Sequence, residues 1–121
     1  MERITGIGGV FLRARLPAEL AAWYAEHLGL ELEEWGGAVF TASGGEVLVW
    51  SPFPADTEYF GRPEQQAMVN YRVSDLDAMV SQLRAAGVEA EDPQETELGR
   101  FAWATDPEGN RFELWQPPPG D

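Results

Sequence analysis

The sequence predicts an α+β domain made of two tandem modules, each with the order strand, helix, strand, strand, strand. Short runs of alternating apolar residues indicate strands, and apolar residues at helical spacing separate them. The second half of the chain then repeats the first: Val10 corresponds to Val69, Gly29 to Gly87 and Trp50 to Trp115. Self-similarity within 121 residues is typical of a pseudo-twofold fold with a cleft between its modules.

The first module is predicted to span residues 1–50. It opens with a strand over residues 4–14, and a helix follows from Pro17, a residue suited to a first helical position, to a stop at Gly29. The apolar stripe of this helix comprises Leu16, Leu20, Trp23, Tyr24 and Leu28. Three further strands are expected near residues 30–35, 38–42 and 46–50.

A linker over residues 51–66 is expected to join the modules. It is rich in proline and has no clear periodicity, yet it carries Phe53, Tyr59 and Phe60. Such aromatic residues rarely stay in water, so we expect the linker to pack against another part of the protein.

The second module is predicted over residues 67–117. Residues 67–73 alternate as a strand does, Ser74 is a suitable N-cap, and the following helix should end at Gly87. Its apolar stripe comprises Leu76, Met79, Val80 and Leu83. The remaining strands are expected near residues 88–91, 100–104 and 111–115, with a tight turn at 106–110 between the last two.

The composition limits the classes of partner. The chain carries 21 acidic and 8 basic residues, for a net charge of -13, which disfavours binding to nucleic acids and to anionic membranes. There is no cysteine, so disulfides and thiolate metal sites are excluded. No apolar run approaches 18 residues and no signal-like segment is present, so we expect a cytoplasmic protein.

Three segments carry a resemblance to a known superfamily. They are residues 70–77 (Asn-Tyr-Arg-Val-Ser-Asp-Leu-Asp), the hairpin 106–115 (Asp-Pro-Glu-Gly-Asn-Arg-Phe-Glu-Leu-Trp) and the helix segment 23–29 (Trp-Tyr-Ala-Glu-His-Leu-Gly). The sequence resembles the glyoxalase, bleomycin-resistance and extradiol dioxygenase proteins of the vicinal oxygen chelate superfamily. The resemblance covers nearly the whole chain, and it implies a single glyoxalase-like domain over residues 1–121 whose curved mixed sheet surrounds a cleft.

The resemblance also implies a position for a divalent metal. Enzymes of the superfamily hold it with His, Gln or Glu side chains from the first and last strand of each module. The internal repeat assigns these positions to Gly9, Leu48, Met68 and Glu113, and only Glu113 carries a suitable donor. The single histidine, His27, is expected on the surface of the first helix. We therefore predict neither a bound metal nor another cofactor.

Side-chain alternation predicts which residues line the cleft. Glu113 is the candidate catalytic residue, as a general base in a desolvated site. The candidate ligand-binding residues are Phe11, Arg13, Leu48, Trp50, Met68, Asn70, Arg72, Trp103, Arg111 and Trp115. A purely structural interpretation stays open, because Glu113 can pair with one of the arginines and the tryptophans can serve packing or a dimer interface.

The resulting function hypothesis is a glyoxalase-like protein that binds or acts on a small organic molecule in the inter-module cleft without the metal of the family. The alternative is a non-enzymatic drug- or metabolite-binding dimer of the bleomycin-resistance type, and a third possibility is a structural or regulatory dimer. A homodimer is expected because open sheet edges need cover, with the linker aromatics supplying contact area.

Overall fold

The computed structural model describes residues 1–119, and the chain divides into two compact units. The N-terminal unit is Gly9–Met68, whereas the C-terminal unit combines Met1–Gly8 with the chain from Val69 onward. Strand β1 (Ile4–Ala14) contributes residues to both units. The predicted module boundaries at residues 50 and 67 stay a prediction.

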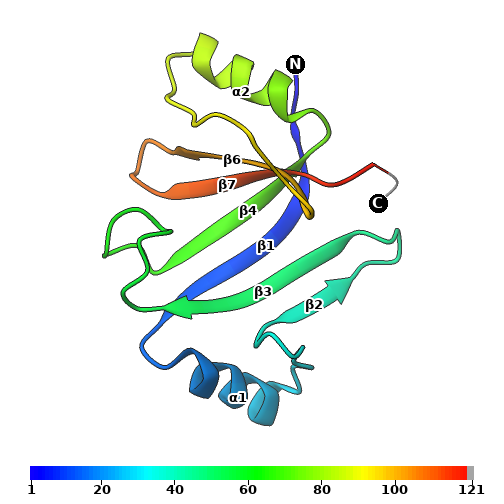
Figure 1. Cartoon of the computed structure of the whole chain (residues 1–121), viewed down its shortest axis with the longest axis vertical. Coiled ribbons are helices and arrows are strands. Elements are labelled where there is room, and N and C mark those ends of the chain that lie inside the picture. Colours follow the sequence, from blue (N-terminus) through cyan, green and yellow to red (C-terminus); the bar gives the residue numbers. More distant parts are fainter. Residues whose placement is uncertain (120–121) are drawn as a thin grey trace. The chain divides into compact units, whose positions relative to one another are not determined.

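The N-terminal unit contains α1 (Pro17–Leu28), β2 (Ala38–Thr41), β3 (Val47–Pro54) and the second half of β1, in the strand order β2-β3-β1 (Figure 1). Strand β3 runs parallel to β1 and antiparallel to β2. Helix α1 begins at Pro17 and ends at Gly29, whose φ of 70° places it in the left-handed region, as predicted. The helix packs on β3, and the core between them contains Ala21, Ala38 and Trp50.

One prediction for this unit is wrong and a second holds only in part. No strand forms at residues 30–35, where the chain turns instead: the amide of Glu33 donates to the Gly37 carbonyl at 2.7 Å. The predicted stripe of α1 is only partly buried, since Leu20 and Tyr24 are half-buried while Leu16, Trp23 and Leu28 are exposed. The ring of Trp50 occupies the space beneath the helix, with Tyr24 at 4.8 Å between ring centroids, so the side chain buried there is the small Ala21.

The linker is held inside the N-terminal unit by one buried arginine. Strand β3 extends to Pro54, so the first four linker residues are strand. Arg13 is 7% exposed, and its guanidinium lies over the Phe60 ring, 5.1 Å from its centroid. Four of its N–H groups donate to linker carbonyls, namely those of Ala55 (2.6 Å), Thr57 (2.9 Å), Arg62 (3.2 Å) and Gln65 (2.9 Å).

The linker aromatics therefore pack within their own unit. Phe60 is fully buried, and Phe53 stacks on Tyr59 with 5.5 Å between ring centroids. The expectation that Phe60 supplies dimer contact area is wrong, because no part of its surface is exposed.

The C-terminal unit contains β4 (Ala67–Val73, from Val69 on), α2 (Leu76–Ala85), β5 (Gln94–Thr96), β6 (Gly99–Thr105) and β7 (Arg111–Gln116). Its strand order is β4-β7-β6-β5, with β4 parallel to β7 and the other pairs antiparallel. Helix α2 covers β6 and β7 (Figure 1). The core beneath it comprises Val73, Leu76, Met79, Val80, Ala102 and Leu114. The strand predicted at 88–91 is only an isolated bridge from Ala90 to Ala104.

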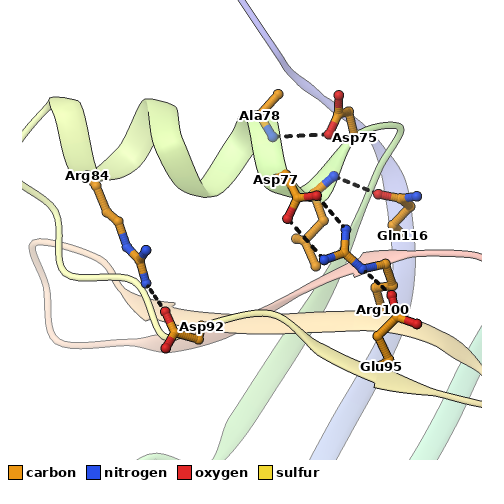
Figure 2. A network of polar contacts seen from close by, with 9 residues as sticks. Asp75, Asp77, Ala78, Arg84, Asp92, Glu95, Arg100 and Gln116 are labelled. Carbon is orange, nitrogen blue, oxygen red and sulfur yellow. Dashed lines mark hydrogen bonds and ion pairs between the residues drawn. The ribbon is translucent and has the colours of Figure 1, made fainter.

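The start of α2 is fixed by side-chain hydrogen bonds (Figure 2). The N-cap is Asp75 and not the predicted Ser74: the Asp75 carboxylate accepts from the amide of Ala78 at 3.1 Å. Gln116 at the end of β7 accepts from the amide of Leu76 at 2.8 Å, which ties the helix to the sheet.

Arg100 on β6 joins this helix to the neighbouring strand (Figure 2). Its guanidinium donates two hydrogen bonds to Asp77, both at 3.0 Å, and lies 2.9 Å from the Glu95 carboxylate on β5. The hydrogen bond from Arg100 lowers the pKa of Asp77, and the same bond raises the pKa of Arg100.

The predicted hairpin between β6 and β7 is confirmed. One carboxylate oxygen of Asp106 accepts from the amides of Glu108 and Asn110, both at 2.9 Å, and Gly109 has a φ of 89°. These hydrogen bonds, led by the one from the Asn110 amide, lower the pKa of Asp106.

The predicted α+β class is confirmed, since the described residues form two helices and seven strands of mixed direction. Among residues 1–119, no helix is long and apolar enough to cross a membrane.

Candidate functional site

Strand pairing in the C-terminal unit brings most of the predicted site residues onto one face. Glu113 on β7 lies opposite Asn70 on β4 and Trp103 on β6, and Trp115 lies opposite Arg72 and Phe101. The alternate residues of these strands pack under α2, so this set faces away from the helix. We call it the aromatic face; its members are Asn70, Arg72, Phe101, Trp103, Arg111, Glu113 and Trp115.

Glu113 is the most deeply buried charged residue of this face, with 2% of its surface exposed. One carboxylate oxygen accepts from the side-chain amide of Asn70 at 2.6 Å, and the other accepts from the Trp103 indole N–H at 2.9 Å. A buried carboxylate requires such donors to replace its lost hydration. The two bonds come from strands on either side of β7, so they fix the carboxylate in one orientation.

An aromatic column runs beside this carboxylate. The ring of Phe101 is nearly parallel to those of Trp103 and Trp115, at 16° and 15°, with centroid distances of 6.4 and 6.3 Å. Arg111 lies over Trp103 at 5.6 Å, and Arg72 lies over Trp115 at 5.4 Å. Sequence reasoning missed Phe101, although it shares the parity of Trp103 and stands two residues before it.

Gly8, a residue of β1, leaves space for the side chains of Asn70 and Trp115 on the aromatic face. A Cβ at this position would lie 2.3 Å from Oδ1 of Asn70 and 2.7 Å from the Trp115 ring, so no larger residue fits without displacement. Oδ1 of Asn70 is buried and has no hydrogen-bond partner among residues 1–119. The orientation of Asn70, and through it that of Glu113, therefore depends on the missing side chain of Gly8.

A cavity of about 600 Å³ adjoins the aromatic face within the C-terminal unit. It lies between the segment Gly87–Glu91 and the β6–β7 hairpin, and both Trp103 and Arg111 line it. Arg111 forms an ion pair with Glu91 at its edge. Trp103 thus borders the cavity and also binds Glu113.

The candidates in the N-terminal unit follow a different pattern. Phe11 and Arg13 face away from α1, as predicted, and the Phe11 ring lies 5.3 Å from that of Phe53. Trp50 and Leu48 require a correction: Trp50 packs against α1, and Leu48, two residues before it, shares that face. Met68 is 1% exposed and therefore buried.

The strand register explains this error. Phe11 pairs with Ser51 in β3, as Asn70 pairs with Glu113 in β7. Ser51 is thus the counterpart of Glu113. The internal repeat paired Leu48 with Glu113 instead, at an offset of 65 residues, and Leu48 lies an odd number of residues before Ser51. An odd shift moves every side chain of a strand to its opposite face.

The donors around Glu113 do not fit a divalent metal. The side chains that contact its carboxylate, Asn70 and Trp103, present N–H donors, and such groups cannot coordinate a cation. Within residues 1–119, no three His, Cys, Asp or Glu side chains converge as a metal site does. His27 lies on α1 with 52% of its side chain exposed, and its ring is tilted by 46° against that of Trp23, with 4.9 Å between the centroids.

The fold and these motifs define a protein of the vicinal oxygen chelate superfamily. More specifically, the chain belongs to the glyoxalase-like domain family, whose model matches residues 9–115. No curated protein matches the sequence.

Solved structures share the fold at low sequence identity. Methylmalonyl-CoA epimerase from Mycobacterium tuberculosis is 25% identical, with a TM-score of 0.65 over 96% of this chain and 90% of the epimerase. A methylmalonyl-CoA epimerase in complex with methylmalonyl-CoA and ammonium is 16% identical, with a TM-score of 0.72 over 97% of each chain. A catechol 2,3-dioxygenase is 20% identical, with a TM-score of 0.59 over 96% of this chain and 42% of the dioxygenase.

Proposed function

We propose that the protein binds a small organic carbonyl compound beside Trp103 and Arg111 and that Glu113 accepts a proton from it. One observation carries the proposal: a carboxylate that is 2% exposed accepts hydrogen bonds from Asn70 and Trp103, and Trp103 also lines a cavity of about 600 Å³. Buried carboxylates in such surroundings are typical general bases.

The chemistry follows from the position of the carboxylate. Each oxygen of Glu113 accepts a hydrogen bond from a neighbouring side chain. In the proposed reaction one carboxylate oxygen takes the proton from the carbon next to the carbonyl group of the ligand. The electron pair of the broken C–H bond forms a carbon–carbon double bond, and the carbonyl π pair moves to oxygen to give an enolate. Return of the proton completes an exchange or an epimerisation without any metal.

The fold of the epimerases supports this class of ligand, because one of them is seen with methylmalonyl-CoA, a thioester with an acidic C–H group. A second candidate function is sequestration of a ligand without chemistry, in a homodimer of the bleomycin-resistance type. The observation that favours it is that both carboxylate oxygens of Glu113 already accept hydrogen bonds from the protein.

Proton exchange and thermal melting separate these functions. Methylmalonyl-CoA is incubated with the protein in D₂O, and exchange of its acidic C–H is followed by NMR; catechol serves as an aromatic probe in melting experiments only. We expect exchange with the parent protein and with the control Glu97→Gln, which changes an exposed carboxylate, and at least about 100-fold slower exchange with Glu113→Gln.

Melting curves of the free protein test the structural alternative. If Glu113 serves a ligand, Glu113→Gln melts close to the parent, and only stabilisation by the bound probe disappears. A loss of about 3 kcal/mol or more in free Glu113→Gln would assign the residue to structure. Stabilisation by a probe without any proton exchange would favour sequestration.

A further inference from the structure

The N-terminal unit exposes an unusual number of large apolar side chains. Six of them lie on α1, on β2 or next to these elements, and their exposed fractions are 60% for Leu16, 51% for Trp23, 65% for Leu28, 55% for Trp35, 40% for Val39 and 51% for Phe40. We call these six residues the α1–β2 surface. Soluble proteins seldom leave two tryptophans and a phenylalanine half-exposed on neighbouring elements without a partner.

Hollows on both sides of α1 shape this surface. One, of about 880 Å³, is lined by Leu16, Leu20 and Trp23, and the other, of about 520 Å³, by Leu28, Val39 and Phe40. Tyr24 lines both, and its ring lies 5.5 Å from that of Trp23. The α1–β2 surface is therefore continuous over the helix and offers pockets in which apolar side chains of a partner can sit.

The charges around the α1–β2 surface are mostly negative, although Arg15 lines the larger hollow beside Glu19. Between residues 15 and 40 the chain carries five glutamates and a single arginine, Arg15. All five glutamates are exposed, and Glu19 and Glu31 line the two hollows. In a symmetric contact with a second copy these carboxylates would face one another, which costs free energy.

We propose that the α1–β2 surface docks a basic amphipathic helix of another protein, whose apolar residues enter the hollows beside Tyr24 and whose lysines or arginines pair with the glutamate rim. Aromatic anchors surrounded by complementary charge are typical of helix recognition in a groove. The contact is independent of Glu113, which lies in the other unit.

A designed peptide tests the proposal directly. The probe is a peptide of about 18 residues, or five helical turns, with leucines on one face and lysines on the other. The matched control peptide replaces every lysine by glutamate. Binding is measured by calorimetry at low and high salt, with the parent protein, with Trp23→Asp and Phe40→Asp, and with Leu98→Asp, which changes a 70% exposed residue of the other unit.

We expect the lysine peptide to bind the parent and Leu98→Asp with equal affinity. Its affinity for Trp23→Asp and for Phe40→Asp should be at least about tenfold lower. Binding should weaken with salt, and the glutamate peptide should bind at least about tenfold more weakly. Equal binding of both peptides, or no effect of either surface variant in folded protein, overturns the proposal. A dimeric mass of the free protein that Trp23→Asp abolishes also overturns it, because a second copy would then occupy the surface.

Discussion

The two units surround their buried charged side chains with different groups. In the N-terminal unit the guanidinium of Arg13 is buried and binds carbonyl groups of the linker. In the C-terminal unit Arg72 and Glu113 are both buried, and the Glu113 carboxylate binds the side chains of Asn70 and Trp103. Backbone carbonyls belong to the fold itself, whereas side-chain donors on neighbouring strands form a face that a ligand can approach. Arg13 therefore holds the linker in place in one unit, whereas Glu113 is the candidate catalytic residue in the other.

The largest effect on stability should come from removing the hydrogen bonds between Arg13 and the linker. Arg13→Met removes the donors of four linker carbonyls, and we expect a loss of about 3 kcal/mol or more in the free energy of unfolding. Chemical denaturation measures it, with the exposed neighbour Arg15→Met as control, expected within about 0.5 kcal/mol of the parent. Equal stability of the two variants would show that Arg13 does not hold the linker.

A smaller loss should follow from Gly8→Ala in the C-terminal unit. The new Cβ would lie 2.3 Å from Oδ1 of Asn70, and moving that side chain should cost about 1–3 kcal/mol. Gly44→Ala is the matched control, because no described residue other than its chain neighbours lies within 4 Å of its Cβ position. Proton exchange by Glu113 should also fall in Gly8→Ala. Unchanged stability and exchange would mean that Asn70 does not depend on this contact.

The pH dependence should be smaller still, because the carboxylates concerned are exposed to solvent. Folding lowers the pKa of Asp77 and of Asp106 from the ordinary value of 3.8, so their stabilisation is present above that pH and lost as the pH falls further. We expect the double variant Asp77→Asn, Asp106→Asn to melt below the parent at neutral pH. The difference should shrink on acidification below pH 3.8. A constant difference would exclude this linkage.

Metal removal should have the smallest effect of all. Since the donors around Glu113 do not fit a cation, protein purified without chelator should contain far less than one zinc, nickel, manganese or iron per chain by elemental analysis. Chelator should leave the melting temperature and the proton exchange unchanged. Stoichiometric metal, with loss of exchange on its removal, would contradict the assignment of Glu113 as a metal-independent base.

Much of the candidate site could be predicted from the parity of residues in β4, β6 and β7. Alternation along the strands, together with the repeat, predicts that Asn70, Trp103 and Glu113 share one face, and strand pairing places Asn70 and Trp103 on either side of Glu113. The prediction that Trp50 faces the cleft is wrong. Alternation defines two faces of a strand but does not say which one meets the helix, and the register of β3 against β1 decides this.

Features that depend on near neighbours follow from the sequence: the ends of α1 at Pro17 and Gly29 and the turn that begins at Asp106. These follow from local backbone preferences and hydrogen bonds within a few residues. The tertiary structure alone decided the partners of the buried ions. The carbonyls that bind Arg13 are 42 to 52 residues away, and Asn70 is 43 residues from Glu113. Contacts at such separations depend on strand register and burial, which no local pattern encodes.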